Sequence, residues 1–279
     1  MSETLANLLK EERTFPPPAA LAAEANVTDV AYQQAADDRL AFWETQARRL
    51  EWSKPWDQVL DWSNPPFAKW FVGGELNVAY NCLDRHVAAG NGDKVAIHWE
   101  GEPGDTRTIT YADLLTSVSQ AANYLTELGV TAGDRVAIYL PMIPEAAVAM
   151  LACARLGATH SVVFGGFSAD SLSNRINDAT AKVVITADGG YRRGKPSGLK
   201  SIVDEALKST PSVEHVLVVR RTGQEVAWGE KDLWWHETVE QAATEHTAQA
   251  FDAEHPLFIL YTSGTTAKRR ESCTPAGAT

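Results

Sequence analysis

Strand-like and helix-like segments alternate along most of this chain, and this alternation constrains the fold more than any other feature of the sequence. From about Leu76 onward, short runs rich in β-branched and aromatic residues are separated by longer segments with helical spacing of apolar residues. Such alternation is typical of parallel strands that are covered by helices. The sequence therefore predicts an α/β fold with a largely parallel sheet flanked by helices.

The individual elements follow from apolar periodicity and from capping signals. Thr110 and Asp113 form a capping box for a helix that ends at Gly129, and Ser168 begins another helix that runs to about Ala179. The other expected helices are 77–88, 144–155 (closed by Gly157), 199–208 and 232–243, and the expected strands are 94–100, 106–111, 135–140, 161–164, 182–187, 215–220 and 256–261.

The first 75 residues have a different character. They are rich in loops and helices, with three consecutive prolines at 16–18 and an expected helix over 30–50. We expect the tryptophans of this region to anchor an irregular arm by burying large flat areas rather than to form a ligand platform. These tryptophans are Trp43, Trp52, Trp56, Trp62 and Trp70.

The charge balance limits the partners of the chain. The net charge of −11 opposes binding to nucleic acid and to anionic membranes, so anionic ligands would have to be held by local basic groups and backbone N–H donors. Cys82, Cys153 and Cys273 lack metal-ligand spacing and fit a reducing compartment. Because we also find no secretory signal and no stretch of membrane-spanning length, we expect a cytoplasmic protein with neither nucleic-acid nor membrane partners.

The expected strand 256–261 runs directly into a loop of small hydroxyl residues around a glycine. Hydroxyls and backbone N–H groups supply hydrogen-bond donors, the glycine permits close approach of a ligand, and a lysine shortly afterwards supplies positive charge. This composition predicts a cradle for phosphate groups. Its residues are Thr262, Ser263, Gly264, Thr265, Thr266 and Lys268.

A second basic feature is the cluster Arg192, Arg193, Gly194 and Lys195, which follows the glycine-rich segment 188–191. Three cations in a glycine-rich loop could clamp a phosphorylated ligand, although a solvated run of charge is the ordinary interpretation. The segment 165–168, Gly-Gly-Phe-Ser, could likewise bind an anion at a helix N-terminus or be only a tight turn. We assign Arg220 and Arg221 to a surface turn.

Other chemistries lack their sequence signals. The seven histidines show no metal-ligand spacing, so we expect no structural metal site. The nucleophile-elbow, Walker A and Rossmann glycine patterns are also missing.

At the phosphate-type loop the sequence resembles the adenylate-forming (AMP-binding) superfamily. Within it, the resemblance is closest to AMP-forming acetate-CoA ligases (acetyl-CoA synthetases), of which the chain resembles the N-terminal part. It extends over nearly the whole chain to Thr266 and is carried by the stretches 66–71, 76–86, 139–145, 160–168 and 261–266. The implied organisation is an N-terminal arm over 1–75, a partial AMP-binding domain over 76–266 and an aberrant tail over 267–279.

The resemblance implies an enzyme that uses ATP with Mg²⁺ to activate acetate and then transfers the acetyl group to CoA. It gives residues 262–266 and Lys268 the role of holding the β- and γ-phosphates of ATP, and Arg192 to Lys195 the role of binding the 3′-phosphate and adenine end of CoA. Family members carry the acyl pocket, the metal ligands and the adenylation lysine beyond this loop. No catalytic residue can therefore be assigned here, and the oligomeric state stays open.

Two departures from the family pattern share one explanation. Position 267 is alanine where the family has glycine, and the residues after Lys268 show neither helix nor strand periodicity. If a gene encoding the family-type continuation Gly-Lys-Ala-Gln-Gly-Val-Leu-His-Thr-Ser-Gly-Gly-Tyr lost a single G, the shifted frame could encode the whole segment from Ala267 to Thr279. We therefore expect a frameshifted, truncated enzyme.

Such a chain is expected to be inactive and prone to aggregate, because its sheets would lose partner strands and expose apolar faces. Three alternatives stay open at this point: a fragment of a propionate or other short-chain acyl-CoA synthetase, a noncatalytic module that binds CoA or a protein partner, and a pseudogene or sequencing artefact without a function of its own.

Overall fold

The computed structural model describes residues 13–262 and 270–275, and of residues 270–273 the backbone alone. The chain divides after Arg49 into two compact units. The expected boundary between residues 75 and 76 stays a prediction.

The first unit is helical. Its helices are α2 (Ala19–Ala23), α3 (Val30–Asp37) and α4 (Arg39–Ala47). The single helix expected over 30–50 is wrong, because Asp38 takes an extended conformation (φ −149°) and its side chain accepts a hydrogen bond from the N–H of Ala41. A short acidic side chain in this position caps a new helix instead of continuing the old one.

The second unit begins with irregular structure that includes two short strand pairs. These are β1 (Gln58–Asn64) with β2 (Phe67–Val72), and β3 (Glu75–Leu76) with β13 (Phe251–Asp252), both antiparallel. Trp52 and Trp56 pack against Phe71, with ring centroids 5.5 and 5.2 Å away, whereas Trp62 is about half exposed. The arm therefore contains strands that its loop-rich composition does not predict.

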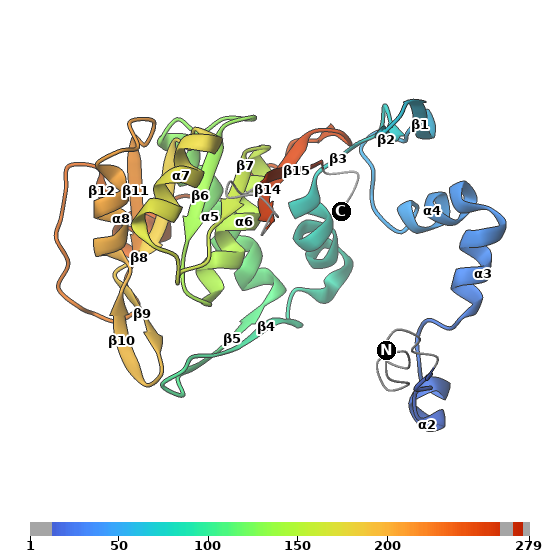
Figure 1. Ribbon diagram of the computed structural model, residues 1–279, viewed down its shortest axis with the longest axis horizontal. Coiled ribbons are helices and arrows are strands. Elements are labelled where there is room, and N and C mark those ends of the chain that lie inside the picture. The colour runs from blue at the N-terminus through green and yellow to red at the C-terminus, as the bar shows by residue number, and fades with distance from the viewer. Residues whose placement is uncertain (1–12, 263–269, 276–279) are drawn as a thin grey trace, which may run out of the picture. The chain divides into compact units, whose positions relative to one another are not determined.

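The centre of the second unit is a sheet whose strands follow the spatial order β12-β11-β8-β6-β7-β14-β15 (Figure 1). Its strands are β6 (Arg135–Tyr139), β7 (Thr159–Val162), β8 (Val183–Ala187), β11 (His215–Val219), β12 (Asp232–Trp234), β14 (Pro256–Thr262) and β15 (Arg270–Pro275). All neighbours in this order are parallel except β14 and β15. The expected α/β class with a largely parallel sheet is confirmed.

Helices cover this sheet on both faces. They are α5 (Tyr111–Glu127), α6 (Pro144–Leu156), α7 (Ala169–Ala179) and α8 (Lys200–Leu207). Helix α5 packs with α6, and α7 packs with α8. The predicted caps are confirmed: Thr110 and Asp113 form a capping box on α5, Ser168 caps α7, and Gly157 closes α6 at φ 69°. Apolar residues of these helices and of the strands form one large core, and Ala79, Ala154 and Leu257 form a smaller separate cluster.

Two expected helices differ from the structure. The helix expected over 232–243 is instead strand β12, the short helix α9 (Trp235–Thr238) and the 3₁₀ turn η3 (Val239–Gln241), because β12 completes a parallel ladder with β11 at the sheet edge. The helix expected over 77–88 is present but contains the wide π-helical turns η1 (Tyr80–Asp84) and η2 (Val87–Asn91).

The strands expected at 94–100 and 106–111 lie outside the parallel sheet. They form an antiparallel hairpin of β4 (Val95–Glu100) and β5 (Thr106–Thr110).

The tail also departs from expectation. Residues 270–275 form strand β15, antiparallel to β14, although their sequence has no strand periodicity. The edge of β14 offers unpaired backbone groups, and backbone hydrogen bonding can recruit a segment to such an edge without a side-chain pattern.

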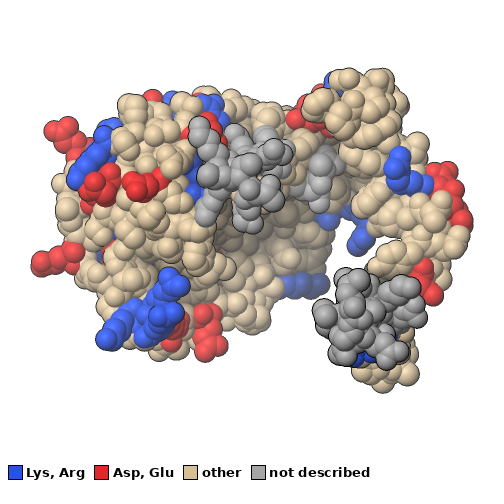
Figure 2. Space-filling view, in the orientation of Figure 1, with Lys and Arg blue, Asp and Glu red and all other residues tan. Residues whose placement is uncertain are grey.

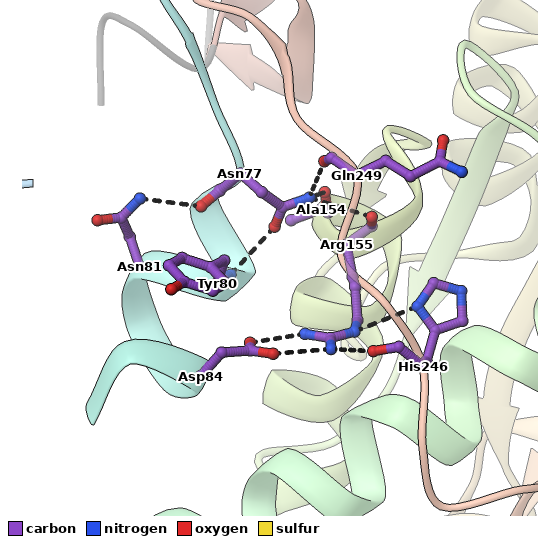
Figure 3. Close-up of polar contacts among 8 residues, drawn as sticks. All are labelled: Asn77, Tyr80, Asn81, Asp84, Ala154, Arg155, His246 and Gln249. Atoms are coloured by element: carbon purple, nitrogen blue, oxygen red, sulfur yellow. Dashed lines mark hydrogen bonds and ion pairs between the residues drawn. The ribbon is translucent and has the colours of Figure 1, made fainter. Parts of the chain in front are cut away.

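A buried polar junction connects the π-helical segment, the end of α6 and the segment 246–249 (Figure 3). The Asn77 amide donates to the carbonyl oxygens of Arg155 (3.1 Å) and Gln249 (2.7 Å). The Arg155 guanidinium, with a side chain 2% exposed, makes two hydrogen bonds to Asp84 at 2.7 and 2.9 Å and also contacts His246. Because a buried charge is tolerated only when it is paired, this junction fixes the three segments together.

A buried histidine makes stability depend on pH. His160 lies on β7, is 8% exposed, and its Nδ1 has no hydrogen-bond partner among the described residues. Burial lowers its pKa to about 4. Because this lies below the unfolded value of about 6.5, the unfolded chain binds the additional proton, and stability falls as the pH drops from about 6.5 towards 4.

Replacing His160 by Gln should flatten this decline. Urea unfolding of both proteins between pH 7 and pH 4 should show the variant losing about 3 kcal/mol less than the wild type, which corresponds to the shift of the histidine pKa. Equal pH dependences would contradict this assignment.

A second prediction concerns Asp188, which follows β8 and is 1% exposed. Its carboxylate accepts hydrogen bonds from the backbone N–H groups of Gly189, Arg221, Thr222 and Gly223 at 2.7–3.2 Å. Asp188→Ala leaves these donors without their acceptor and should lower the free energy of unfolding by about 3 kcal/mol or more. In urea denaturation, substitution of the exposed Asp93 by Ala serves as the control and should change stability by less than about 0.5 kcal/mol.

Candidate functional site

A pocket of about 330 Å³ opens at the edge of the sheet where several parallel strands end. Residues that follow the carboxyl ends of β6, β7, β8 and β11 line it, together with residues of the β4–β5 hairpin. The lining residues are Trp99, Glu100, Gly101, Glu102, Leu140, Pro141, Met142, Ile143, Phe164, Gly165, Gly166, Gly190, Tyr191, Arg192, Ser197, Leu199 and Arg221.

The strand order explains why a pocket forms here. The chain passes from β6 through α6 to β7 on one side, and from β8 through α8 to β11 on the other. Because right-handed crossovers in opposite directions place their helices on opposite faces of the sheet, the loops after β6 and β8 diverge and leave a crevice. Ligands of open α/β sheets bind at such switch points.

The loop after β7 forms one wall. The buried Tyr139 hydroxyl donates to the carbonyl oxygens of Gly165 (3.2 Å) and Phe167 (2.8 Å), which fixes the course of the loop. A Cβ at Gly166 would lie only 2.6 Å from the ring of Phe164, so a side chain at this position would require that ring to move. For the segment 165–168 the sequence allowed either an anion site or a tight turn. In the structure the segment contributes to the lining of a pocket and also leads into α7.

The cationic cluster lies on a hairpin rather than in an irregular loop. Strands β9 (Gly189–Arg192) and β10 (Lys195–Gly198) pair antiparallel, with Arg192 opposite Lys195. The two turn residues, Arg193 and Gly194, have φ angles of 54° and 74°, as a two-residue hairpin turn of type I′ requires. Figure 2 shows Lys and Arg side chains gathered over this hairpin.

The hairpin divides the predicted cluster. All three cations are exposed, but only Arg192 contributes to the pocket wall, where its guanidinium approaches Gly166, and Arg193 and Lys195 lie outside the lining. Gly194 donates its backbone N–H to the carboxylate of Glu102.

Sequence reasoning missed Arg221. The expected surface turn is wrong for this residue, because its side chain is only 15% exposed and lines the pocket. Its guanidinium makes two hydrogen bonds to Asp105, at 2.7 and 3.0 Å, and these lower the pKa of the Asp105 carboxyl. It also stacks on the rings of Trp99 and Tyr191, 5.0 and 4.8 Å from their centroids. No local signal could reveal a partner so distant in sequence.

Of the predicted phosphate loop, Thr262 ends β14, and Ser263, Gly264, Thr265, Thr266 and Lys268 lie outside the described residues. Since β14 is parallel to β7, its carboxyl end lies at the same sheet edge as the pocket. The guanidinium of Arg175 contacts the rings of Phe167 and Tyr261, 4.6 and 5.0 Å from their centroids. Arg175 thereby connects the loop after β7 to the strand that leads into the predicted phosphate loop.

Within residues 13–262 and 270–275, no group of three or more His, Cys, Asp or Glu side chains is arranged to hold a metal ion. No helix in the same part of the chain is both long and apolar enough to cross a membrane.

Comparisons with known proteins agree on one family. The family model "AMP-binding enzyme" matches residues 84–270, and "Acetyl-coenzyme A synthetase N-terminus" matches residues 28–82. An acetyl-coenzyme A synthetase of Streptomyces coelicolor is 72% identical over 268 residues, which are 96% of this chain and 41% of that protein. The acetyl-coenzyme A synthetase of Mycobacterium tuberculosis is 68% identical over 91% of this chain and 40% of that protein. That of Deinococcus radiodurans is 56% identical over 93% of this chain and 41% of that protein.

The chain thus spans about two fifths of the length of these relatives. The resemblance inferred from the sequence motifs is confirmed: the chain belongs to the AMP-binding enzyme family and is similar to part of the acetyl-coenzyme A synthetases.

Proposed function

We propose that this chain is the part of an AMP-forming acetate-CoA ligase that binds the nucleotide end of CoA and begins the phosphate-binding loop for ATP. The observation that carries the proposal is the pocket at the β6–β8 switch point, with Arg192 in its wall. The names of the relatives supply the reaction class.

The reaction would proceed in two steps. A carboxylate resists nucleophilic attack because its charge is delocalised and oxide is a poor leaving group. Acetate therefore attacks the α-phosphate of ATP to give acetyl-AMP and pyrophosphate, and the CoA thiol then displaces AMP to give acetyl-CoA. In this proposal residues 262–266 and Lys268 hold the β- and γ-phosphates and act by positioning and by charge stabilisation.

Mg²⁺ is expected to arrive with the nucleotide. We assign no residue to it, because the described residues contain no suitable cluster of ligands. Its contribution when bound is to neutralise phosphate charge.

For CoA, we propose that Arg192 contacts the 3′-phosphate directly, that Arg193 and Lys195 supply the surrounding positive field, and that Gly194 permits the tight turn that carries them. The support is the placement of Arg192 beside the glycine loop 165–166, which lets a ligand contact both guanidinium and backbone. An arginine can form two parallel hydrogen bonds with a phosphate, which gives orientation as well as affinity.

The remaining expectations also stand as proposals. Acetate is favoured over propionate or another short acid by the relatives' names alone, and a noncatalytic CoA-binding role is the alternative that the pocket equally permits. The cytoplasm remains the proposed compartment, because Cys82 and Cys153 are free thiols. The shifted reading frame over 267–279 also stays a proposal, which the nucleotide sequence decides.

The CoA proposal is tested by titration calorimetry on the 279-residue chain. Arg192→Ala should weaken CoA binding by about tenfold, the loss of one charge-assisted contact, and should affect dephospho-CoA, which lacks the 3′-phosphate, much less. Arg39→Ala, on an exposed helix of the first unit, is the matched control and should bind CoA as the wild type does. A wild-type chain that binds no CoA, or one that binds CoA and dephospho-CoA equally, would refute the proposal.

The purified chain alone should not catalyse the proposed reaction. We expect no acetate-dependent release of pyrophosphate from ATP, because family members place the acyl pocket and the adenylation lysine beyond the phosphate loop. Val162 and Leu260, on the neighbouring strands β7 and β14, are 40% and 51% exposed, which supports the expected tendency to aggregate. A pyrophosphate-release assay with the Streptomyces relative as positive control checks this, and measurable turnover would overturn it.

A further inference from the structure

Two hairpins that are distant in sequence are joined beside the pocket. Hairpins β4–β5 and β9–β10 extend from the same end of the second unit (Figure 1). Arg221 lies between them, because it is hydrogen-bonded to Asp105 in the first hairpin and stacked on Tyr191 in the second. We propose that Arg221 is a positioning residue that holds the β9–β10 hairpin in place and thereby sets Arg192 in the pocket wall; this inference rests on the proposed CoA function.

Arg221 is held at both ends. Its backbone N–H donates to the buried Asp188 carboxylate at 2.8 Å, while its guanidinium is fixed by the two hydrogen bonds to Asp105. A planar guanidinium that makes a bidentate pair has little remaining freedom. With its charge already balanced by Asp105, this arginine is better suited to hold the hairpins than to bind a phosphate itself.

The contacts of Arg221 extend into a longer stack. The guanidinium groups of Arg221 and Arg107 each lie 5.0 Å from the centroid of the Trp99 ring. The Trp99 indole N–H donates to the carbonyl oxygen of Met142 at 2.8 Å. Arg107 is in turn paired with Glu145 at the start of α6, at 2.7 and 2.9 Å. The β4–β5 hairpin is therefore anchored to the parallel-sheet domain and can act as a fixed support.

Tyr191 connects Arg221 to the β9–β10 hairpin that contains Arg192. It immediately precedes Arg192 on β9 and is paired with Pro196 on β10, so the position of its ring restricts the whole hairpin. The hydrogen bond from Gly194 to Glu102 adds a second link between the same two hairpins. Loss of the Arg221 contacts should therefore move or loosen Arg192 without altering its chemistry.

One substitution separates this role from a direct contact with CoA. Asp105→Asn removes the carboxylate that balances Arg221 and leaves the arginine present. If Arg221 bound the ligand's phosphate itself, releasing its charge would strengthen CoA binding; if Arg221 positions the hairpin, binding weakens. Asp105 has a side chain 44% exposed, so its replacement should leave the core intact.

We would measure CoA binding by titration calorimetry and amide exchange by mass spectrometry for the wild type, Asp105→Asn and Arg221→Lys. Both variants should bind CoA about three- to tenfold more weakly and should exchange amides of residues 189–198 faster, because lysine keeps the charge but loses the bidentate pair and the planar stack. Glu205→Gln is the matched control, since it removes a paired carboxylate on the exposed side of α8, and it should change neither readout.

Unchanged or tighter CoA binding by Asp105→Asn would overturn the positioning role. A wild-type chain that binds no CoA would refute the proposed function instead. The exchange data then decide the inference alone: faster exchange at 189–198 in both variants would support the clamp, and exchange equal to that of the wild type would refute it.

Discussion

The parallel alignment of the central strands is the constraint on which the rest of the structure depends. Because β6, β7, β8, β11 and β14 run in the same direction, all of their carboxyl ends reach one edge of the sheet. Strand ends that are far apart in sequence are thereby brought to a single edge. The crossovers leave β6 and β8 towards opposite faces, and the crevice between their loops becomes a pocket.

Buried charges fix the loops and segments around this framework. Asp188 gathers backbone N–H groups from two segments, and Arg155 joins the π-helical segment to α6 through Asp84. The side chain of Lys200 on α8 is 1% exposed and pairs with Asp232 on the edge strand β12 at 2.7 Å. In each case a group that would be costly to bury alone is paired with one from a distant part of the chain, so the interaction specifies tertiary arrangement more than it adds stability.

The local elements were largely predictable, and the exceptions have physical reasons. Ser168, Gly157 and the Thr110–Asp113 box mark helix ends through short-range hydrogen bonds or backbone conformation, so sequence pattern identifies them. The segment 232–243 has helical spacing, but its first residues lie beside β11 and complete the sheet. At Asp38 a capping side chain divides a helix that apolar periodicity alone would continue.

The sequence by itself determined the α/β class, the family and the residue types of the predicted phosphate loop and of the Arg192 cluster, because each depends on residues that are adjacent in the chain. Only the tertiary structure decided which of those residues meet. It put Arg192 in the pocket wall and left Arg193 and Lys195 outside, since a type I′ turn fixes where each side chain projects. It also placed Arg221 between Asp105 and Tyr191, a contact that depends on two hairpins being brought together by the sheet between them.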